Sequence, residues 1–382
     1  MSLIPRNDTS ILGRWWNEVD QGQIWTVLIL ILAGWVIMFT GSAQEALQDN
    51  QPLLNFSARK ALIVFAGLII MFGASLVPPS IMPLITRAGF ALALLLLLSL
   101  FIFGVSKNGA TRWLAVPGLP FAPQPTEFVK PFFVLIVALC LAKARDWGFA
   151  RAFWAAAACC GIVAVLIITQ PDVSQTAFIV VVFLVMVFMG GLALEWVVVL
   201  GGFASAAAVT LYFTIPHVRY RVDGFWMRTT GQDGNLRDHN DMAEDAFRNG
   251  GVEGLGLGEG RLKTSIPEAK NDMPLAIIGE EMGLIGALVV FGFFILVWTR
   301  TQRRLANMSN DFQRLGAIGL AFLLIAQALI NIFYTIGLIP TTGITLPFFS
   351  DGGSSLIASA LTVGFLLSLT RQRAPHMAGQ RV

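Results

Sequence analysis

The chain has 382 residues, of which 55% are hydrophobic and 13% are charged, and its mean hydropathy is +0.71. Apolar runs of about 17 to 25 residues recur from one end to the other, which is the length that crosses a bilayer as a helix. This pattern excludes an ordinary water-soluble protein and predicts an all-α polytopic membrane protein. The formal net charge is only +3, and we expect no nucleic-acid partner.

Ten segments are long and apolar enough to be predicted as transmembrane helices, with ends uncertain by a few residues. They are Ile24–Thr40, Ala61–Val77, Leu84–Val105, Phe128–Ala144, Ala152–Thr169, Gln175–Met189, Leu194–Ile215, Leu275–Thr299, Phe312–Leu338 and Ser354–Thr370. The three cysteines all fall within these apolar segments, so we interpret them as small buried hydrophobic residues and predict neither a disulfide nor a zinc site.

The distribution of lysine and arginine predicts the orientation of the spans. With both termini in the cytoplasm, the cytoplasmic segments hold thirteen of these cations and the short external loops with the adjoining helix ends hold five. We therefore predict a cytoplasmic tail over residues 1–23, a membrane domain over residues 24–370 and a second cytoplasmic tail over residues 371–382.

One connection, residues 216–273, is far longer than is needed to join two helices. It carries ten acidic and eight basic residues, and the predicted orientation places it on the outer face. Its second half is rich in glycine, which indicates tight backbone geometry and local order.

Ionisable residues in or beside the spans are candidates for a functional site. Glu127 and Lys130 lie one helical turn apart at the start of the fourth span, although they could also form a self-neutralising pair with no catalytic role. Asp272 lies where the long loop meets the eighth span, although it could simply cap that helix ahead of Pro274. The topology places six such groups on one side of the membrane, around a pocket that opens outward: Arg112, Glu127, Lys130, Asp172, Asp272 and Asp351.

Four sequence blocks stand out along the chain: Asn108–Leu114, Gln124–Lys130, Pro267–Asp272 together with Gly279–Gly283, and Pro340–Ser355. In this order and topology they resemble the SEDS family (shape, elongation, division and sporulation), and the resemblance covers all ten predicted spans. The chain looks most like the division branch, FtsW, with the elongation branch, RodA, as the second choice.

The resemblance implies a peptidoglycan glycosyltransferase that polymerises lipid II in the bacterial inner membrane at the division septum. It also implies a class B penicillin-binding transpeptidase and other divisome membrane proteins as partners. The family's essential carboxylate falls on Asp272. The chain departs from the family pattern at Lys270-Asn271, Met273-Pro274, Asp351 and Val173-Ser174-Gln175, and these departures admit a divergent paralogue with reduced activity.

The implied reaction converts an α-linked diphosphate into a β-glycosidic bond, so it inverts the anomeric carbon. A single displacement of this kind needs a general base and stabilisation of the leaving diphosphate. We assign Asp272 as the base and Lys130 and Arg112 as the main cations. Further substrate contacts are expected from Lys263, Lys270, Glu127, Glu268 and Ser354.

The sequence leaves three points open. No cofactor is certain, although a divalent cation, Mg²⁺ or Mn²⁺, could share the neutralisation of the diphosphate. A lipid II flippase or other transporter would also need polar residues within spans. A non-catalytic divisome scaffold that recruits the transpeptidase is the remaining alternative.

Overall fold

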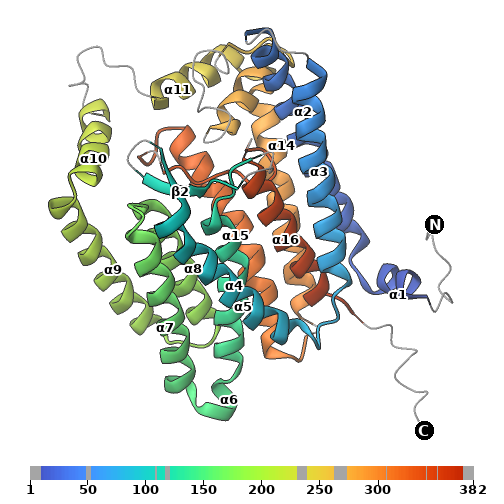
Figure 1. Ribbon diagram of the computed structural model, residues 1–382, viewed down its shortest axis with the longest axis vertical. Coiled ribbons are helices and arrows are strands. Elements are labelled where there is room, and N and C mark those ends of the chain that lie inside the picture. The colour runs from blue at the N-terminus through green and yellow to red at the C-terminus, as the bar shows by residue number, and fades with distance from the viewer. Residues whose placement is uncertain are drawn as a thin grey trace.

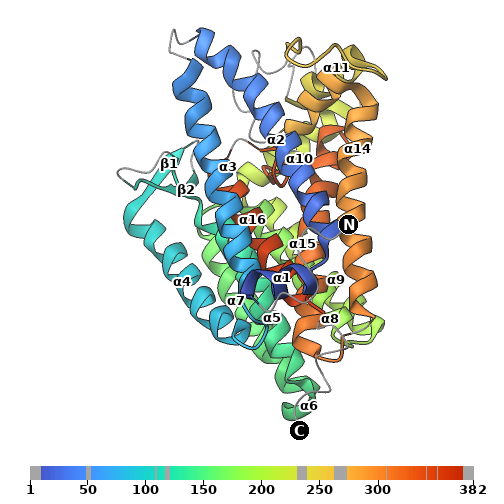
Figure 2. The ribbon, with the colours of Figure 1, turned by 90° about the vertical axis from the view of Figure 1, so that its right-hand side faces the viewer.

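The computed structural model describes residues 10–48, 53–107, 110–116, 121–229, 239–261, 273–306, 308–340, 342–350 and 352–372. The described part is a bundle of long helices, shown in two views in Figure 1 and Figure 2. The long apolar helices are α2 (Gln21–Gln48), α3 (Leu53–Leu76), α4 (Met82–Phe103), α5 (Pro125–Ala142), α7 (Phe149–Ile168), α8 (Val173–Met189), α9 (Leu194–Thr214), α14 (Pro274–Leu305), α15 (Asp311–Thr335) and α16 (Gly353–Leu369).

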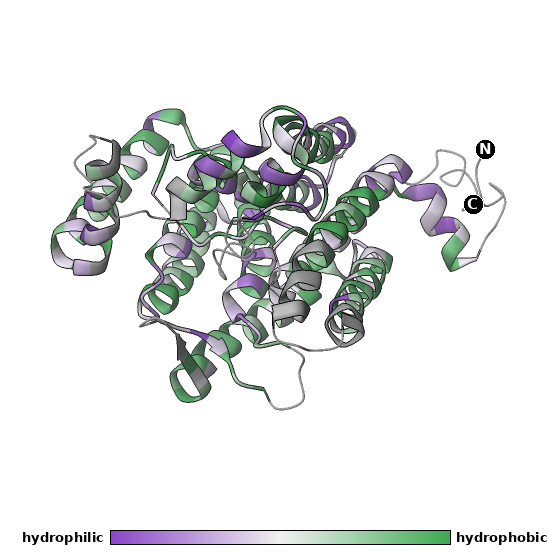
Figure 3. Ribbon diagram, turned by 90° about the horizontal axis from the view of Figure 1, so that it is seen from above, coloured by the Kyte–Doolittle hydropathy of each residue, from purple (hydrophilic) through white to green (hydrophobic). Residues whose placement is uncertain are grey.

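These helices coincide in position with the predicted spans. Seven of them are long and apolar enough to cross a membrane, and three shorter apolar segments lie at Lys60–Leu76, Val173–Met189 and Gly353–Leu369. Helix residues coloured as hydrophobic dominate the bundle seen from above (Figure 3). The structure therefore agrees with a polytopic helical membrane protein, while the full number of ten crossings stays a prediction.

Both described ends of the chain lie at the same end of the bundle. The amide nitrogen of Gln372, just beyond α16, donates to the carbonyl oxygen of Glu18, at the end of α1 (Ile11–Glu18), over 3.0 Å. The last turns of α14 reach the same place, because Arg300 pairs with Asp20 at 3.2 Å. An even number of crossings would give this arrangement.

The opposite end of the bundle holds the beginnings of α5, α14 and α16. The backbone of Gln124, just before α5, donates to the Oγ of Ser354 in α16 over 2.9 Å. A short hairpin follows α4, with β1 (Gly104–Lys107) antiparallel to β2 (Ala110–Leu114) and an irregularity between Val105 and Ser106. The sequence predicts only a short external loop for this segment.

Helix α5 lies in the centre of the bundle. It packs against α4, α7, α8, α15 and α16, and most of its residues are buried. Helix α9 lies at the periphery (Figure 1), where it packs against α8 and α10, and none of its residues is buried. Polar side chains carried by the first turns of α5 are therefore held in the interior of the protein.

In its described residues, the connection between α9 and α14 contains the helices α10 (Pro216–Thr229) and α11 (His239–Gly250), followed by a glycine-rich segment. The short α6 (Ala144–Trp147) joins α5 and α7 at the other end of the bundle (Figure 1). The order expected from the glycines of residues 250–260 is confirmed for this stretch, which packs against the start of α14. The side of the membrane on which the connection lies stays a prediction.

Helix α14 is interrupted at Gly283, whose φ of 66° and ψ of −168° are not helical. The glycine-rich segment pairs with the backbone around the interruption. Leu255 and Gly256 donate to the carbonyl oxygens of Glu280 and Glu281 over 2.9 and 3.0 Å. In the other direction, the amides of the two residues after Gly283 donate to carbonyl oxygens of residues 251 and 252 at distances of 3.0 and 3.3 Å. These bonds satisfy backbone groups that a continuous helix would pair internally.

Candidate functional site

The first turns of α5 carry the most deeply buried ion pair of the described residues. Lys130 Nζ lies 2.7 Å from Glu127 Oε1, and the two side chains are 2% and 3% exposed. Proline at the first helical position and the i,i+3 spacing fix this geometry. The Lys130 ammonium also lies 5.6 Å from the centre of the Phe178 ring of α8. The predicted pairing of Glu127 with Lys130 is therefore present, and it places a cation and a carboxylate inside the bundle.

A second ion pair joins the hairpin to the turn between α7 and α8. Arg112 Nε lies 3.2 Å from Asp172 Oδ2, and Arg112 Nη2 donates to the carbonyl oxygen of Pro171 over 3.1 Å. Burial raises the pKa of the Asp172 carboxyl above its ordinary value, while the Arg112 guanidinium and the Gln175 amide act in the opposite direction. A single arginine thus holds β2 to the end of α7.

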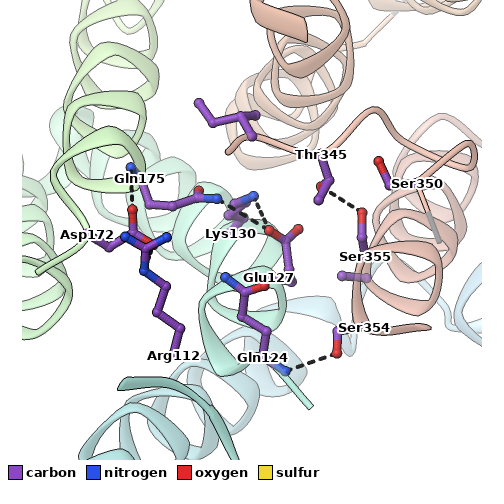
Figure 4. A network of polar contacts seen from close by, with 12 residues as sticks. Arg112, Gln124, Glu127, Lys130, Asp172, Gln175, Thr345, Ser350, Ser354 and Ser355 are labelled. Carbon is purple, nitrogen blue, oxygen red and sulfur yellow. Dashed lines mark hydrogen bonds and ion pairs between the residues drawn. The ribbon is translucent and has the colours of Figure 1, made fainter. Parts of the chain in front are cut away.

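Gln175 links the two ion pairs. Its backbone amide donates to Asp172 Oδ1 over 3.3 Å, as expected for an N-cap aspartate, and its side-chain Nε2 donates to Glu127 Oε1 over 3.5 Å. Figure 4 shows the side chains of Arg112, Asp172, Gln175, Glu127 and Lys130 facing one another between α5, β2 and α8.

Hydroxyl groups from the end of the chain border this cluster on the other side (Figure 4). Ser355 Oγ donates to Thr345 Oγ1 over 2.7 Å, and Ser350 Oγ accepts from the amide of Leu346 over 2.9 Å. Ser354 accepts from the amide of Gln124, so its oxygen holds α16 to the start of α5. This contact gives Ser354 a structural role, whereas its predicted contact with a substrate stays a prediction.

Of the predicted site residues, Lys130, Glu127, Arg112 and Ser354 are brought together. The others lie outside the described residues: Asp272, Lys263, Glu268 and Lys270. The N-cap position of α14, which the alternative gave to Asp272, is occupied by Met273, and Pro274 is the first helical residue. The role of Asp272 as a general base stays a prediction.

Three features of the site were not predicted from the sequence. The contact of Arg112 with Asp172, the link through Gln175 and the contact of Gln124 with Ser354 each join segments far apart in the chain. The only available signal for Gln175 was that it departs from the family pattern at that position.

The described residues contain no group of three or more histidine, cysteine, aspartate or glutamate side chains that could hold a metal ion. Within the same residues, the carboxylates of Glu127 and Asp172 are already paired with cations. A divalent cation would need donors from elsewhere, such as Asp272, and stays a prediction.

The chemistry of the cluster follows from its charges. Two cations and two carboxylates are held in the interior, where charges interact more strongly than in water. An anionic ligand that reached Lys130 or Arg112 would have to compete with a carboxylate for the cation. The cluster is electrically balanced, so an anionic ligand would bind there only by displacing a carboxylate from its cation.

Comparison with known proteins identifies the relatives of this chain. Residues 21–374 match the family of FtsW, RodA and SpoVE, described as "Cell cycle protein". The chain is 33% identical over 374 residues to the "Probable peptidoglycan glycosyltransferase FtsW" of Caulobacter vibrioides, which covers 96% of this chain and 93% of that protein. It is 32% identical over 363 residues to the protein of the same name from a Geobacter species, with coverage of 93% and 97%.

Solved structures show the same fold. One, reported as "Structural coordination of polymerization and crosslinking by a peptidoglycan synthase complex", gives a TM-score of 0.73 at 24% identity and covers 95% of this chain and 99% of its own. The rod shape determining protein RodA of Thermus thermophilus gives 0.65 at 24% identity, with coverage of 93% and 97%. The match over almost the entire chain shows that this protein belongs to the FtsW, RodA and SpoVE family, the SEDS family that its sequence blocks resemble.

Proposed function

We propose that the chain is a peptidoglycan glycosyltransferase that joins lipid II units into glycan strands during septal cell-wall synthesis. Relatives that share more than nine tenths of its length bear the name probable peptidoglycan glycosyltransferase FtsW. The observation that carries the proposal is the buried arrangement of Lys130 with Glu127 and of Arg112 with Asp172 at one end of a bundle of apolar helices. A lipid-linked diphosphate needs apolar surroundings for its hydrocarbon tail and cations beside its diphosphate group.

The reaction we propose is a single displacement with inversion. Asp272 accepts the proton of the attacking sugar hydroxyl, and Lys130 and Arg112 neutralise the departing diphosphate. Asp272 immediately precedes Met273, the N-cap of α14, and α14 begins at the same end of the bundle as α5 and α16. This position supports the assignment, because it is the end that holds the buried cations.

We also propose that the chain works with a class B penicillin-binding transpeptidase, together with other divisome membrane proteins. A solved structure that shares its fold is described as coordinating polymerisation and crosslinking. Both termini would lie in the cytoplasm, as the lysine and arginine distribution favours, and the site would face the outer side of the inner membrane.

The test is polymerisation of lipid II by the purified full chain in detergent, with and without the transpeptidase. We expect Asp272→Asn to lower the rate by about 10²–10⁴-fold, which is the usual contribution of a general base. The matched control is Asp146→Asn, which changes an exposed aspartate at the opposite end of α5. Asp146→Asn should retain the parent rate.

Each alternative predicts a different result. If Asp272→Asn polymerises at the parent rate, Asp272 is not the base. If the parent protein makes no polymer with or without the transpeptidase but moves labelled lipid II across the membrane of vesicles, it is a transporter. Rescue of a depletion strain by Asp272→Ala would favour a scaffold.

A further inference from the structure

Among the described residues, Gln175 is the one that donates hydrogen bonds to the carboxylates of both buried ion pairs. Its backbone amide donates to Asp172, and its Nε2 donates to the same Glu127 oxygen that Lys130 contacts. The side chain is buried at 1% exposure. Figure 4 shows the carboxamide of Gln175 extending from α8 toward the Glu127 and Lys130 pair.

The orientation of the carboxamide identifies what Gln175 contributes. A carboxylate oxygen only accepts hydrogen bonds, so the group that faces Glu127 must be the amide nitrogen. The Oε1 of Gln175 is buried and has no hydrogen-bond partner among the described residues. A buried oxygen without a partner is unfavourable, and an apolar side chain of similar size would avoid it. The contribution of this residue to the cluster is therefore its N–H donor.

The hydrogen bond that Gln175 donates to Glu127 becomes important when Lys130 moves away from that carboxylate. Lys130 can neutralise an anionic group only by weakening its contact with Glu127, and a buried carboxylate that loses its cation is strongly destabilised. The Gln175 N–H lies on the same carboxylate oxygen and remains there when the ammonium turns away. At 3.5 Å this hydrogen bond is long, so it can shorten when the cation withdraws.

We propose that Gln175 is a positioning residue that stabilises the Glu127 carboxylate while Lys130 contacts the anionic group of the substrate. Gln175 does not touch the reacting atoms in this scheme. It acts through Glu127, so that Lys130 can be shared between its carboxylate and a diphosphate. The catalytic half of this inference rests on the proposed function, whereas the structural half does not.

The chain offers a closely matched control in Gln170, which lies in the turn between α7 and α8, shortly before Gln175 in the first turn of α8. Gln170 is 3% exposed, its Nε2 donates over 3.5 Å and its Oε1 is also buried without a partner. Its acceptor, however, is the backbone carbonyl of Leu97 and not a carboxylate. Replacing either glutamine by methionine removes one equally long hydrogen bond from an equally buried site.

The first experiment measures the melting temperature of the full chain in detergent and requires no catalytic activity. Gln175→Met and Gln170→Met are each made alone and combined with Lys130→Met. We expect Gln175→Met to lower the melting temperature much more in the Lys130→Met background than in the parent, because the double variant leaves Glu127 without either donor. Gln170→Met should lower the melting temperature equally in the parent and in the Lys130→Met background. Equal effects of Gln175→Met in both backgrounds would overturn the proposal.

The second experiment measures polymerisation kinetics with lipid II. We expect Gln175→Met to lower kcat by about tenfold or more, with little change in KM. This factor corresponds to the usual free-energy contribution of one hydrogen bond to a charged group. Gln170→Met, which removes a neutral contact, should change kcat far less. A parent-like kcat for Gln175→Met, or an equal loss for both variants, would refute the role in catalysis. Inactivity of the parent chain would instead refute the proposed function, and the melting experiment would still decide whether Gln175 supports Glu127.

Discussion

The ammonium nitrogen of Lys130 and the carboxylate oxygen Oε1 of Glu127 lie 2.7 Å apart, and neither side chain is more than 3% exposed. The same helix ends near a second pair with the same spacing in sequence, Lys143 and Asp146, but these side chains are 43% and 67% exposed and lie 3.5 Å apart. A buried pair cannot lose one member without leaving the other charge uncompensated, whereas an exposed pair can. The two pairs therefore provide a comparison within one protein.

We predict that Lys130→Met destabilises the protein by about 3–5 kcal/mol and abolishes polymerisation, because Glu127 is left buried without its cation. Lys143→Met, in contrast, should change stability by less than about 1 kcal/mol. Thermal unfolding in detergent and polymerisation of lipid II measure the two effects.

Exchanging the residues separates a structural role from a functional one. The double variant Glu127→Lys with Lys130→Glu keeps a buried pair, so it should recover most of the lost stability. It moves the ammonium by one helical turn, about 5 Å, and should remain inactive if Lys130 contacts the substrate. Recovery of polymerisation in this double variant would mean that the pair serves only to neutralise itself.

The break in α14 predicts a strong dependence on Gly283. A Cβ at this position would come within 2.4 Å of the carbonyl oxygen of Val252, and its φ of 66° is rarely adopted by other residues. Gly283→Ala should therefore destabilise the protein by about 1–3 kcal/mol. In the same helix, no neighbouring atom lies within 4 Å of the position that a Cβ of residue 292 would take, so Gly292→Ala should be neutral or stabilising by up to about 1 kcal/mol. Equal melting temperatures for the two variants would contradict this account.

The sequence predicted well those features that depend on local composition. The apolar runs place the long helices, and Pro274 marks the first residue of α14. The i,i+3 spacing of Glu127 and Lys130 predicts their contact, because one helix carries both residues. These features need no knowledge of how distant segments pack.

The features that were not predicted depend on contacts between distant segments. The interruption at Gly283 falls inside the predicted eighth span and forms because residues 251–256 supply its backbone partners. The contact of Arg112 with Asp172 joins positions 60 residues apart in the chain, and no local pattern specifies which acidic group a given arginine will meet. The hairpin of β1 and β2 is too short to give a strand pattern.

Arg112 makes two contacts that a lysine could not make together. Its Nε lies beside Asp172 and its Nη2 donates to the Pro171 carbonyl, so the planar guanidinium spans two acceptors. We predict that Arg112→Lys lowers the rate of lipid II polymerisation by about tenfold or more, since the hydrogen bond that the charged guanidinium donates to the Pro171 carbonyl is lost. Arg219→Lys provides the control, because Arg219 pairs with Asp223 in α10 and is 62% exposed. A parent-like rate for Arg112→Lys would show that a point charge is sufficient at this position.

Asp20 makes several contacts at the end of the bundle where both described ends of the chain lie. Its carboxylate accepts from the amide of Gln23 over 3.0 Å and pairs with Arg300 at 3.2 Å and Arg304 at 3.5 Å. Asp20→Asn should lower stability by about 1–2 kcal/mol, a modest loss because Arg300 is 33% exposed and solvent weakens its pairing.

Salt should separate the ionic part of this effect from the helix-capping part. Asparagine can still accept the hydrogen bond from Gln23, so Asp20→Asn removes mainly the attraction to the two arginines. Salt screens partly exposed charges, and the difference in melting temperature between parent and Asp20→Asn should therefore shrink as sodium chloride is raised from about 0.1 to 1 M. The exposed Asp146→Asn should show little difference at either concentration. A difference for Asp20→Asn that does not change with salt would mean that Asp20 acts through packing and hydrogen bonding, because screening leaves those contacts intact.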